Sequence, residues 1–364
     1  MNIYFDNSAT TVPVKQAYDA FLKCSYANPS SLHTLGYNAE LEFLDSVKTI
    51  AKAIGCNSDE IVITSGATES NNLAIMGVAR ALKRKGNRIV TTKIEHPSVL
   101  EAVKALEKEG FEIIFVSPND NMEYTKECFL PYINENTILV SCMAVNNETG
   151  LLLPVEDIAT AVKRVNPNLY FHTDNVQGFL RYDIKLKNID LLSVSAHKVG
   201  GFKGVGALYI KKGVRLIPLL YGGGQQKNIR PGTHNLPLTV AFAAAINANL
   251  QNLEHYKMLK EYLLSKLPCG VTVNSKQNAA PYIVNISVKN IRSEIMLHFL
   301  SSKGVYVSSG SACAKGVSSY VLSSLKVDNP DSALRISFGY QNTKEEIDCF
   351  INALEEGISS IKTN

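Results

Sequence analysis

The feature that most constrains the fold is a regular alternation of strand and helix patterns between about residues 35 and 250. In chain order, the pattern predicts a helix at 40–54, a strand at 61–64, a helix at 69–85, a strand at 88–92, a helix at 97–109 and a strand at 111–116. Residues 137–145 form a near-continuous apolar run, which is typical of a strand buried on both faces. Repeated strand–helix units predict an α/β fold with a mostly parallel sheet covered by helices.

A second, smaller domain is expected because 364 residues are too many for one typical core. A helical stretch at 236–267 is expected to lead out of the first domain, and residues 282–288 then alternate like a strand with one buried face. A helix near 294–301 and a C-terminal helix follow. We therefore predict a large domain at 16–250 and a small α+β domain made of 1–15 with 251–364.

Composition excludes several classes of protein. A formal charge of +4 with 19% charged residues is too mild for a nucleic-acid footprint. No apolar run reaches the length of a membrane-spanning helix, and the N-terminus lacks the pattern of a signal peptide. The sequence thus predicts a cytoplasmic protein with no membrane or nucleic-acid partner.

The seven cysteines are scattered and include no Cys-x-x-Cys pair, which argues against a disulfide framework or a zinc site. We expect reduced thiols and no metal. Cys142 and Cys349 lie among apolar residues and are expected to be buried. Cys313 lies among small residues in a segment expected to be an exposed loop, where the nearby Lys315 would favour the thiolate.

Two charged residues follow apolar strand patterns. Lys198 comes soon after residues 190–194, and Asp174 ends the stretch that begins at Leu169. A pyridoxal phosphate (PLP) site needs a lysine for the Schiff base and an aspartate beside the pyridine nitrogen. Such sites lie beyond the carboxyl ends of parallel strands. Each residue alone has an ordinary alternative, a helix cap for Asp174 and a solvated loop lysine for Lys198, but their coincidence favours the cofactor site.

Four further segments carry candidate chemistry, each with an ordinary alternative. The strand-to-helix turn that contains Thr68 has the glycine and free amides of a phosphate site, or is a simple helix cap. His96 is suited to stacking on a flat ring and to proton transfer, or only begins a helix. The paired amides at 146–147 suit a cofactor hydroxyl, or form a polar turn. Arg335 offers a fork for a carboxylate, or forms a structural ion pair.

With these pieces in place, the chain resembles the cysteine desulfurases of the NifS/IscS group, within the class V aminotransferase family of fold type I PLP enzymes. The resemblance runs from Tyr4 almost to the C-terminus. Its motifs lie at 4–11, 28–33, 65–72, 95–96, 146–148, 172–174, 195–198, 230–233 and 309–313. The family implies a large PLP-binding domain with a seven-stranded, mostly parallel sheet, and a smaller α+β domain with the catalytic cysteine.

The resemblance also implies a role for each matched residue. Lys198 is similar to the Schiff-base lysine that takes the Cα proton, and Cys313 to the sulfur-accepting nucleophile. His96 would stack on the ring and join the catalytic set. The other expected cofactor ligands are Asp174, Gln177, Asn147, Val176, Ala67, Thr68, Ser195, His197 and Thr233. Of these, Thr233 would reach the partner subunit's phosphate, which implies a homodimer. Asn28 and Arg335 would bind the substrate carboxylate.

The implied reaction converts L-cysteine to L-alanine and leaves a persulfide on Cys313, for transfer to an acceptor protein in iron–sulfur cluster assembly or tRNA thiolation. A selenocysteine lyase, or another PLP-dependent C–S lyase of the same family, is an alternative. A catalytically silent scaffold dimer is another. The sequence departs from the family pattern at Asn175, where a small residue is usual, and in a shorter segment after Cys313.

Overall fold

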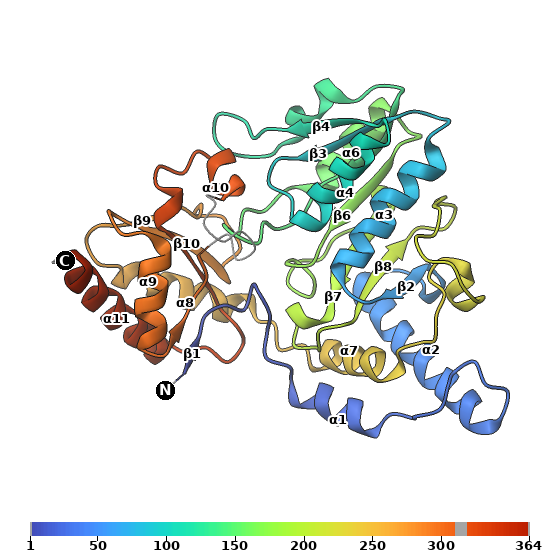
Figure 1. The fold of residues 1–364 in the computed structure, drawn as a ribbon, viewed down its shortest axis with the longest axis horizontal. Coiled ribbons are helices and arrows are strands. Elements are labelled where there is room, and N and C mark those ends of the chain that lie inside the picture. Colours follow the sequence, from blue (N-terminus) through green and yellow to red (C-terminus); the bar gives the residue numbers. More distant parts are fainter. Residues whose placement is uncertain (1, 310–318, 363–364) are drawn as a thin grey trace. The chain divides into compact units, whose positions relative to one another are not determined.

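The computed structural model describes residues 2–309 and 319–362, which form two compact units. The large unit comprises Val12–Ala144 and Leu153–Asn249, and the small unit comprises Met1–Thr11, Val145–Leu152 and Leu250–Asn364. Figure 1 shows the elements of both units in sequence colours. The sequence placed residues 145–152 in the large domain, whereas in the structure they pack with the small unit.

A seven-stranded sheet forms the centre of the large unit, in the order β2-β8-β7-β6-β5-β3-β4 (Figure 1). Its strands are β2 (Ile61–Thr64), β3 (Arg88–Thr92), β4 (Glu112–Val116), β5 (Thr137–Ser141), β6 (Tyr170–Asp174), β7 (Leu191–Ser195) and β8 (Gly206–Ile210). Neighbouring strands pair in parallel except at β8, which is antiparallel to both β2 and β7. The predicted seven-stranded, mostly parallel sheet is confirmed.

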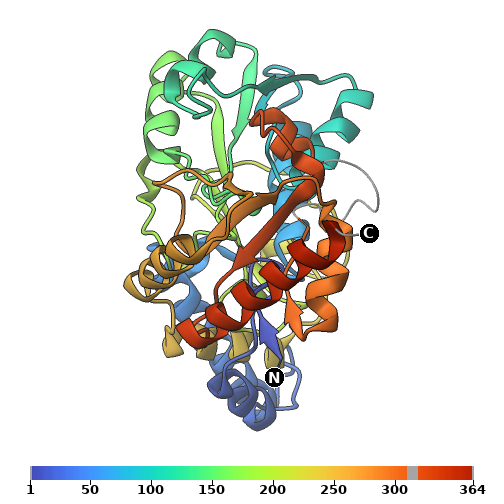
Figure 2. The same ribbon diagram turned by 90° about the vertical axis from the view of Figure 1, so that its left-hand side faces the viewer.

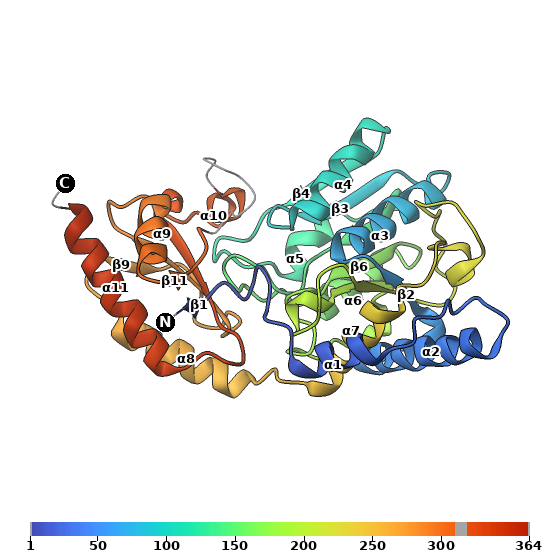
Figure 3. The same ribbon diagram turned by 60° about the horizontal axis from the view of Figure 1, so that its bottom comes forward.

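Helices cover this sheet. They are α1 (Lys15–Lys23), α2 (Thr34–Ile54), α3 (Ala67–Leu82), α4 (Pro97–Lys108), α5 (Lys126–Phe129), α6 (Val155–Val165) and α7 (Leu236–Ala248). Helix α3 contacts strands β5 to β8 and packs beside α4, while α1 and α2 both pack on α7 (Figure 3). Because helices cover the sheet, β5, β7 and β8 are buried along their whole length. This burial explains their continuous apolar character.

Strand β5 is shorter than predicted. It ends at Ser141, not at Val145. The backbone N–H groups of Cys142 and Ala144 still donate to carbonyls of β6, and Val145 then forms an antiparallel bridge with Leu152. An apolar run alone cannot distinguish a strand from the buried hairpin that follows it.

The predicted helical stretch at 236–267 is two helices, α7 and α8 (Leu253–Lys266). Asn249 ends α7 with φ of 38°, in the left-handed region, and its backbone N–H donates to the backbone carbonyls of Ala245 and Ile246. Asparagine tolerates this conformation better than most residues, and it stops the helix. The boundary between the two units falls at this break.

The small unit holds a three-stranded antiparallel sheet in the order β12-β10-β9 and a two-stranded parallel pair, β1-β11. Its elements are β1 (Ile3–Tyr4), β9 (Val271–Val273), β10 (Ile283–Val288), β11 (Val305–Tyr306), β12 (Ala333–Ser337), α8, α9 (Ser293–Ser302), α10 (Tyr320–Ser324) and α11 (Lys344–Lys362). Helices α8, α9 and α11 lie together on one face of the sheet (Figure 2).

Strand β10 is buried along its whole length, so the prediction of a single buried face is wrong. It is the central strand, and residues 145–152 approach it in addition to the helices. The Asn285 side chain donates to the Glu148 carbonyl oxygen at 3.2 Å, and the Ser275 hydroxyl donates to the Thr149 carbonyl oxygen. The segment that covers β10 comes from a distant part of the sequence, which is why the pattern of β10 alone did not reveal it.

Two cysteine predictions have different outcomes. Cys142 is buried, as predicted, whereas Cys349 is exposed. Cys349 lies on the exposed side of α11, whereas its apolar neighbours Ile347 and Phe350 are buried. Within the described ranges, no helix is long and apolar enough to cross a membrane. The same residues contain no group of three or more His, Cys, Asp or Glu side chains placed to hold a metal ion.

Candidate cofactor site

The two charged residues singled out from the sequence lie at the same edge of the large unit's sheet. Asp174 is the last residue of β6, and Lys198 ends a short 3₁₀ turn (Ala196–Lys198) that follows β7. Strands β6 and β7 are parallel neighbours, so both residues lie at carboxyl ends. This edge is where open α/β sheets place their ligands.

The Asp174 side chain is buried, with 6% of its surface exposed, and its contacts are with neutral donors. The Asn71 side-chain amide donates to Oδ2 at 2.7 Å, and the Val176 backbone N–H donates to Oδ1 at 3.0 Å. No lysine or arginine among the described residues forms an ion pair with this carboxylate. A buried carboxylate that forms no ion pair is costly, so its surroundings suit a cationic group on a ligand.

His96 lies close enough to both charged residues to interact electrostatically with each. It is the N-cap of α4, and its Nδ1 atom accepts from the Ser98 backbone N–H at 3.1 Å. Burial lowers the pKa of His96, and the charge of Lys198 lowers it further, while the charge of Asp174 acts in the opposite direction. His96, Asp174 and Lys198 therefore form one cluster in the large unit, and the balance of these effects favours a neutral imidazole.

The turn between β2 and α3 has the features of an anion site. Gly66 has φ of 149°, a conformation that residues with a side chain rarely adopt. Gly206 packs closely against it, since a Cβ on Gly206 would lie 2.8 Å from the Gly66 Cα. Helix α3 begins at Ala67 without a side-chain cap, and no described residue accepts from the amide N–H groups of Ala67 or Thr68. Free donors at a helix N-terminus attract phosphate. Ser195, which ends β7, lies against this turn.

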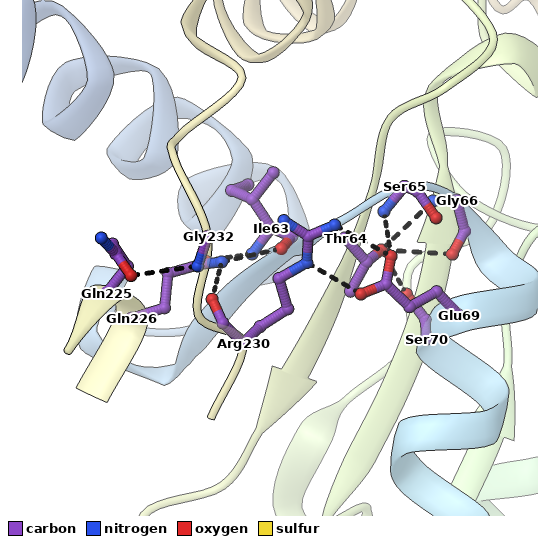
Figure 4. Close-up of polar contacts among 10 residues, drawn as sticks. All are labelled: Ile63, Thr64, Ser65, Gly66, Glu69, Ser70, Gln225, Gln226, Arg230 and Gly232. Carbon is purple, nitrogen blue, oxygen red and sulfur yellow. Dashed lines mark hydrogen bonds and ion pairs between the residues drawn. The ribbon is translucent and has the colours of Figure 1, made fainter. Parts of the chain in front are cut away.

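Figure 4 shows how this turn is held from its other side. Glu69 accepts from the Ser65 backbone N–H at 2.6 Å and forms an ion pair with Arg230 at 2.8 Å. The Gln226 side chain pairs with the backbone of edge strand β2, accepting from the Ile63 N–H at 2.6 Å and donating to the Ile63 carbonyl at 2.9 Å. These bonds fix the segment that leads to Thr233, which is itself exposed.

The remaining large-unit candidates lie beside these residues in sequence. Val176 and Gln177 are buried after β6, and His197 is half-buried in the Lys198 turn. Burial, with the charges of Lys198 and Lys203, lowers the pKa of His197 to about 4. Asn28 is exposed, and its side-chain oxygen accepts from the Ser30 backbone N–H.

In the small unit, Arg335 and Asn147 come together. The Arg335 guanidinium forms an ion pair with the Asp6 carboxylate at 2.7 Å and donates to the Asn147 carbonyl oxygen at 3.0 Å. Its Nε–H is buried and has no partner among the described residues. Nearby, burial raises the pKa of Glu148 to about 7, although Ser319 donates to its carboxyl and the charge of Arg335 acts in the opposite direction. Cys313 lies outside the described residues.

Sequence reasoning assigned no role to Asn71, Ser98 or Asp6. Asn71 is fully buried, and its amide also donates to the Ser98 hydroxyl at 2.8 Å. The Ser98 hydroxyl in turn contacts His96 Nδ1 at 2.8 Å. A polar residue on the buried face of a helix, such as Asn71 on α3, was the available signal, because buried polar groups need partners.

Comparison with known proteins agrees with this arrangement. The family model described as "Aminotransferase class-V" matches residues 3–350. The chain is 38% identical to a protein of Dictyoglomus turgidum named "Cysteine desulfurase IscS", over 99% of this chain and 95% of that protein. It is 39% identical to the "Putative cysteine desulfurase IscS 1" of Bacillus subtilis, over 95% of each.

A solved structure described as "NIFS-LIKE PROTEIN" superimposes with a TM-score of 0.93 at 36% identity, covering 99% of this chain and 100% of that one. Matches of this extent cover both units rather than the sheet alone. The chain therefore belongs to the class V aminotransferase family and, within it, to the NifS/IscS group of cysteine desulfurases.

Proposed function

We propose that this protein uses pyridoxal phosphate to convert L-cysteine to L-alanine, with Cys313 as the residue that accepts the sulfur. The single observation that carries the proposal is the cluster of Lys198, Asp174 and His96 beside the uncapped turn that begins α3. Family membership supports the reaction class, and the cluster supplies the groups that this reaction requires.

The residues present fit the cofactor at two places. The buried Asp174 carboxylate is held by neutral donors, so the protonated nitrogen of a pyridine ring would supply the missing cation. The amides of Ala67 and Thr68, with the Ser195 and His197 side chains nearby, suit the phosphate. His96 and Val176 are expected to contact the faces of the ring, and Gln177 and Asn147 to bind its hydroxyl.

When bound, the cofactor supplies an electron sink for negative charge at the substrate Cα. Lys198 would hold it covalently and move the Cα proton. Asp174 would keep the ring nitrogen protonated, because a buried negative charge favours the cationic form of a neighbouring group. The substrate carboxylate would bind Arg335 and Asn28. Since Asp6 already pairs with Arg335, the substrate would share the guanidinium, with the buried Nε–H as an available donor.

The sulfur step balances without an external oxidant. The Cys313 thiolate attacks the sulfur of L-cysteine and forms a sulfur–sulfur bond. The carbon–sulfur bond breaks, its electron pair stays on carbon, and that carbon takes a proton to give L-alanine. The substrate sulfur becomes the outer atom of a persulfide, which a sulfur-acceptor protein would take up. Iron–sulfur cluster assembly and tRNA thiolation are the candidate destinations, and a cytoplasmic location stays a prediction.

A homodimer is supported by an apolar face on the large unit. Leu22, Tyr26 and Leu32 are 78%, 92% and fully exposed. The other members of this face are Tyr18, Phe21, Leu35, Tyr37, Leu41 and Leu44, on α1, α2 and the segment between them. Monomeric proteins rarely expose so many large apolar side chains together, so a second copy of this chain is the proposed occupant.

The dimer proposal has a direct test. Lys198→Ala and Thr233→Ala variants, each of low activity, are mixed, dissociated and reassociated. If Thr233 serves the partner subunit's phosphate site, the mixed dimer regains one intact site and activity returns. If Thr233 acts within its own subunit, each site keeps one defect and mixing restores nothing.

The reaction is tested with Cys313→Ser and a Cys269→Ser control, since Cys269 is exposed and lies away from every candidate residue in sequence. We expect the first variant to bind L-cysteine and lose alanine formation, while the control keeps it. If Cys313→Ser still releases sulfide from L-cysteine without added thiol, with pyruvate and ammonia in place of alanine, a direct C–S lyase reaction replaces the persulfide route.

A further inference from the structure

A chain of three hydrogen bonds joins Asp174 to His96 within the large unit. The Asn71 amide nitrogen donates one hydrogen to Asp174 Oδ2 at 2.7 Å and the other to the Ser98 hydroxyl at 2.8 Å. The Ser98 hydroxyl lies 2.8 Å from His96 Nδ1. Asn71 on α3 and Ser98 in the first turn of α4 thus link two residues of the proposed cofactor site without belonging to its expected ligands.

The direction of each bond follows from the donors available. The Ser98 backbone N–H can only donate, and it points at His96 Nδ1, so this nitrogen carries no proton. Asn71 fills an acceptor position of the Ser98 hydroxyl, which leaves the hydroxyl hydrogen for the same Nδ1 atom. Turning the Asn71 amide over would set its oxygen against the Asp174 carboxylate, which is unfavourable. The imidazole proton must therefore be on Nε2.

We propose that Asn71 and Ser98 are positioning residues, which orient Asp174 and His96 together and hold His96 as the neutral Nε2–H tautomer. This inference rests on the proposed function for its catalytic meaning, but its structural content concerns only the chain's own residues. Its consequence is chemical. The Nε2 atom of His96 carries the proton and is a hydrogen-bond donor, so His96 stabilises negative charge on a neighbour. It does not act as a base through Nε2 while the Ser98 contacts last.

The residues that form these hydrogen bonds are buried, so their partners are fixed. Asn71 is fully buried and Ser98 is 8% exposed, so neither can exchange its partners for bulk water. The charged groups that act on His96 are Asp174, at the end of β6, and Lys198, in the turn after β7. Both lie at the ends of neighbouring parallel strands, which fix their positions relative to each other.

The test is ¹⁵N NMR of histidine-labelled full-length protein, with the cofactor bound and after its removal, titrated with pH. The chain has seven histidines, and His96→Gln assigns the signal. We expect a neutral His96 with its proton on Nε2. Ser98→Ala removes one donor to the neutral imidazole and should raise the pKa of His96 by about 0.5–1 unit. Ser46→Ala is the matched control, because Ser46 is also a buried helical serine with one hydrogen bond.

Asn71→Ala tests the link between the two ends. It frees the Ser98 hydroxyl to rotate, so the pKa of His96 should rise by less than in Ser98→Ala. In the double variant the change should be smaller than the sum of the two single changes, because part of the effect of Asn71 passes through the missing hydroxyl. Asn166→Ala, which removes another buried amide with two donated bonds, should leave His96 unchanged. If Asn71→Ala does not fold, the Ser98 and Ser46 variants still decide the tautomer and the pKa change.

Three results would overturn the inference: a wild-type His96 with its proton on Nδ1, an equal pKa in Ser98→Ala and Ser46→Ala, or additive changes in the double variant. None of these depends on desulfurase activity. A protein that forms no persulfide but gives the expected NMR result would refute the proposed function and keep the positioning role, and the opposite pair of results would do the reverse.

Discussion

Asp174 in the large unit and Asp6 in the small unit are held in different ways. In the large unit, neutral groups hold Asp174 and Glu95. Asn71 and Val176 donate to Asp174, and the Thr92 hydroxyl and the Met143 amide donate to Glu95. In the small unit, Asp6 pairs directly with the Arg335 guanidinium. Asp174 forms no ion pair, so its charge is left for a ligand to match, whereas the charge of Asp6 is already matched by Arg335.

This difference assigns separate tasks to the two units. A carboxylate without a cation is suited to holding a cationic ring nitrogen, at a cost in stability that ligand binding relieves. A paired arginine is rigid and oriented, so it is suited to recognising a carboxylate in a fixed direction. We therefore expect substitutions in the large-unit cluster to change chemistry and proton affinity, and substitutions in the small-unit pair to change stability.

The largest expected effect is on chemistry. Lys198→Ala should lower alanine formation by at least about 10²–10⁴-fold, because the variant loses both the covalent link and the base. Lys203→Ala is the matched control from the loop between β7 and β8, and its exposed side chain should be replaceable without loss of activity. Assays at saturating cofactor compare the two. Equal activities would mean that neither lysine carries the reaction.

A buried acid in the large unit gives the next largest effect. Burial raises the pKa of Glu95 to about 8, with the charge of Asp174 acting in the same direction. The folded protein then holds a proton that the unfolded chain releases above about pH 4.5. Its stabilising contribution is complete below pH 4.5 and is lost as the pH rises through about 8.

Glu95→Gln keeps the acceptor oxygen and removes this titration. Between pH 4.5 and 8, the unfolding free energy of the wild type should fall relative to that of the variant by about 1.4 kcal/mol per pH unit. Urea unfolding at several pH values measures the difference between the two proteins. A difference that is constant with pH would show that Glu95 is ionised in the folded state.

Asp6→Asn probes the small-unit pair. It keeps the shape of the side chain but leaves the Arg335 guanidinium buried without an anion, so we expect a loss of about 2–3 kcal/mol in unfolding free energy. Glu109→Gln is the control, because its ion pair with Arg80 lies at the surface and is worth about 0.5 kcal/mol or less. Denaturant unfolding compares them, and equal losses would contradict the assigned importance of the buried pair.

The smallest effect is expected at the segment that holds the β2–α3 turn. Arg230→Lys keeps the charge facing Glu69 but loses the fork, and both partners are partly exposed, so the loss should be about 0.5–1 kcal/mol. Thermal unfolding with and without phosphate measures it. A much larger loss would show that this ion pair supports the fold of the turn as well as its position.

Much of the fold could be predicted because the signals are local. Strands β2 and β3 were predicted with the bounds that the structure has, since each is a short apolar run between turn residues. The sequence could place Asp174 and Lys198 close together, because neighbouring parallel strands have their carboxyl ends at the same edge of a sheet. Their proximity to His96 agrees with that reasoning, although their chemical roles await experiment.

The failures share one physical cause, which is dependence on distant parts of the chain. Residues 145–152 cover β10, a strand more than a hundred positions later, so neither segment alone revealed the contact. The exposure of Cys349 depends on which face of α11 packs on α8 and α9. Asn71 and Ser98 meet only because α3 and α4 lie side by side on the sheet. The local sequence pattern predicts helices and strands, whereas the contacts between them depend on how they pack.

The most direct test of the account is mass spectrometry of the protein's peptides after incubation with L-cysteine and cofactor, with alanine measured in the same solution. The chain supplies its own controls, because Cys269 and Cys349 are exposed thiols outside the proposed reaction. The account predicts one added sulfur on Cys313, its absence in Lys198→Ala, and alanine in equal amount. Sulfur spread over Cys269 and Cys349, or found on Cys24 or Cys128 alone, would contradict it.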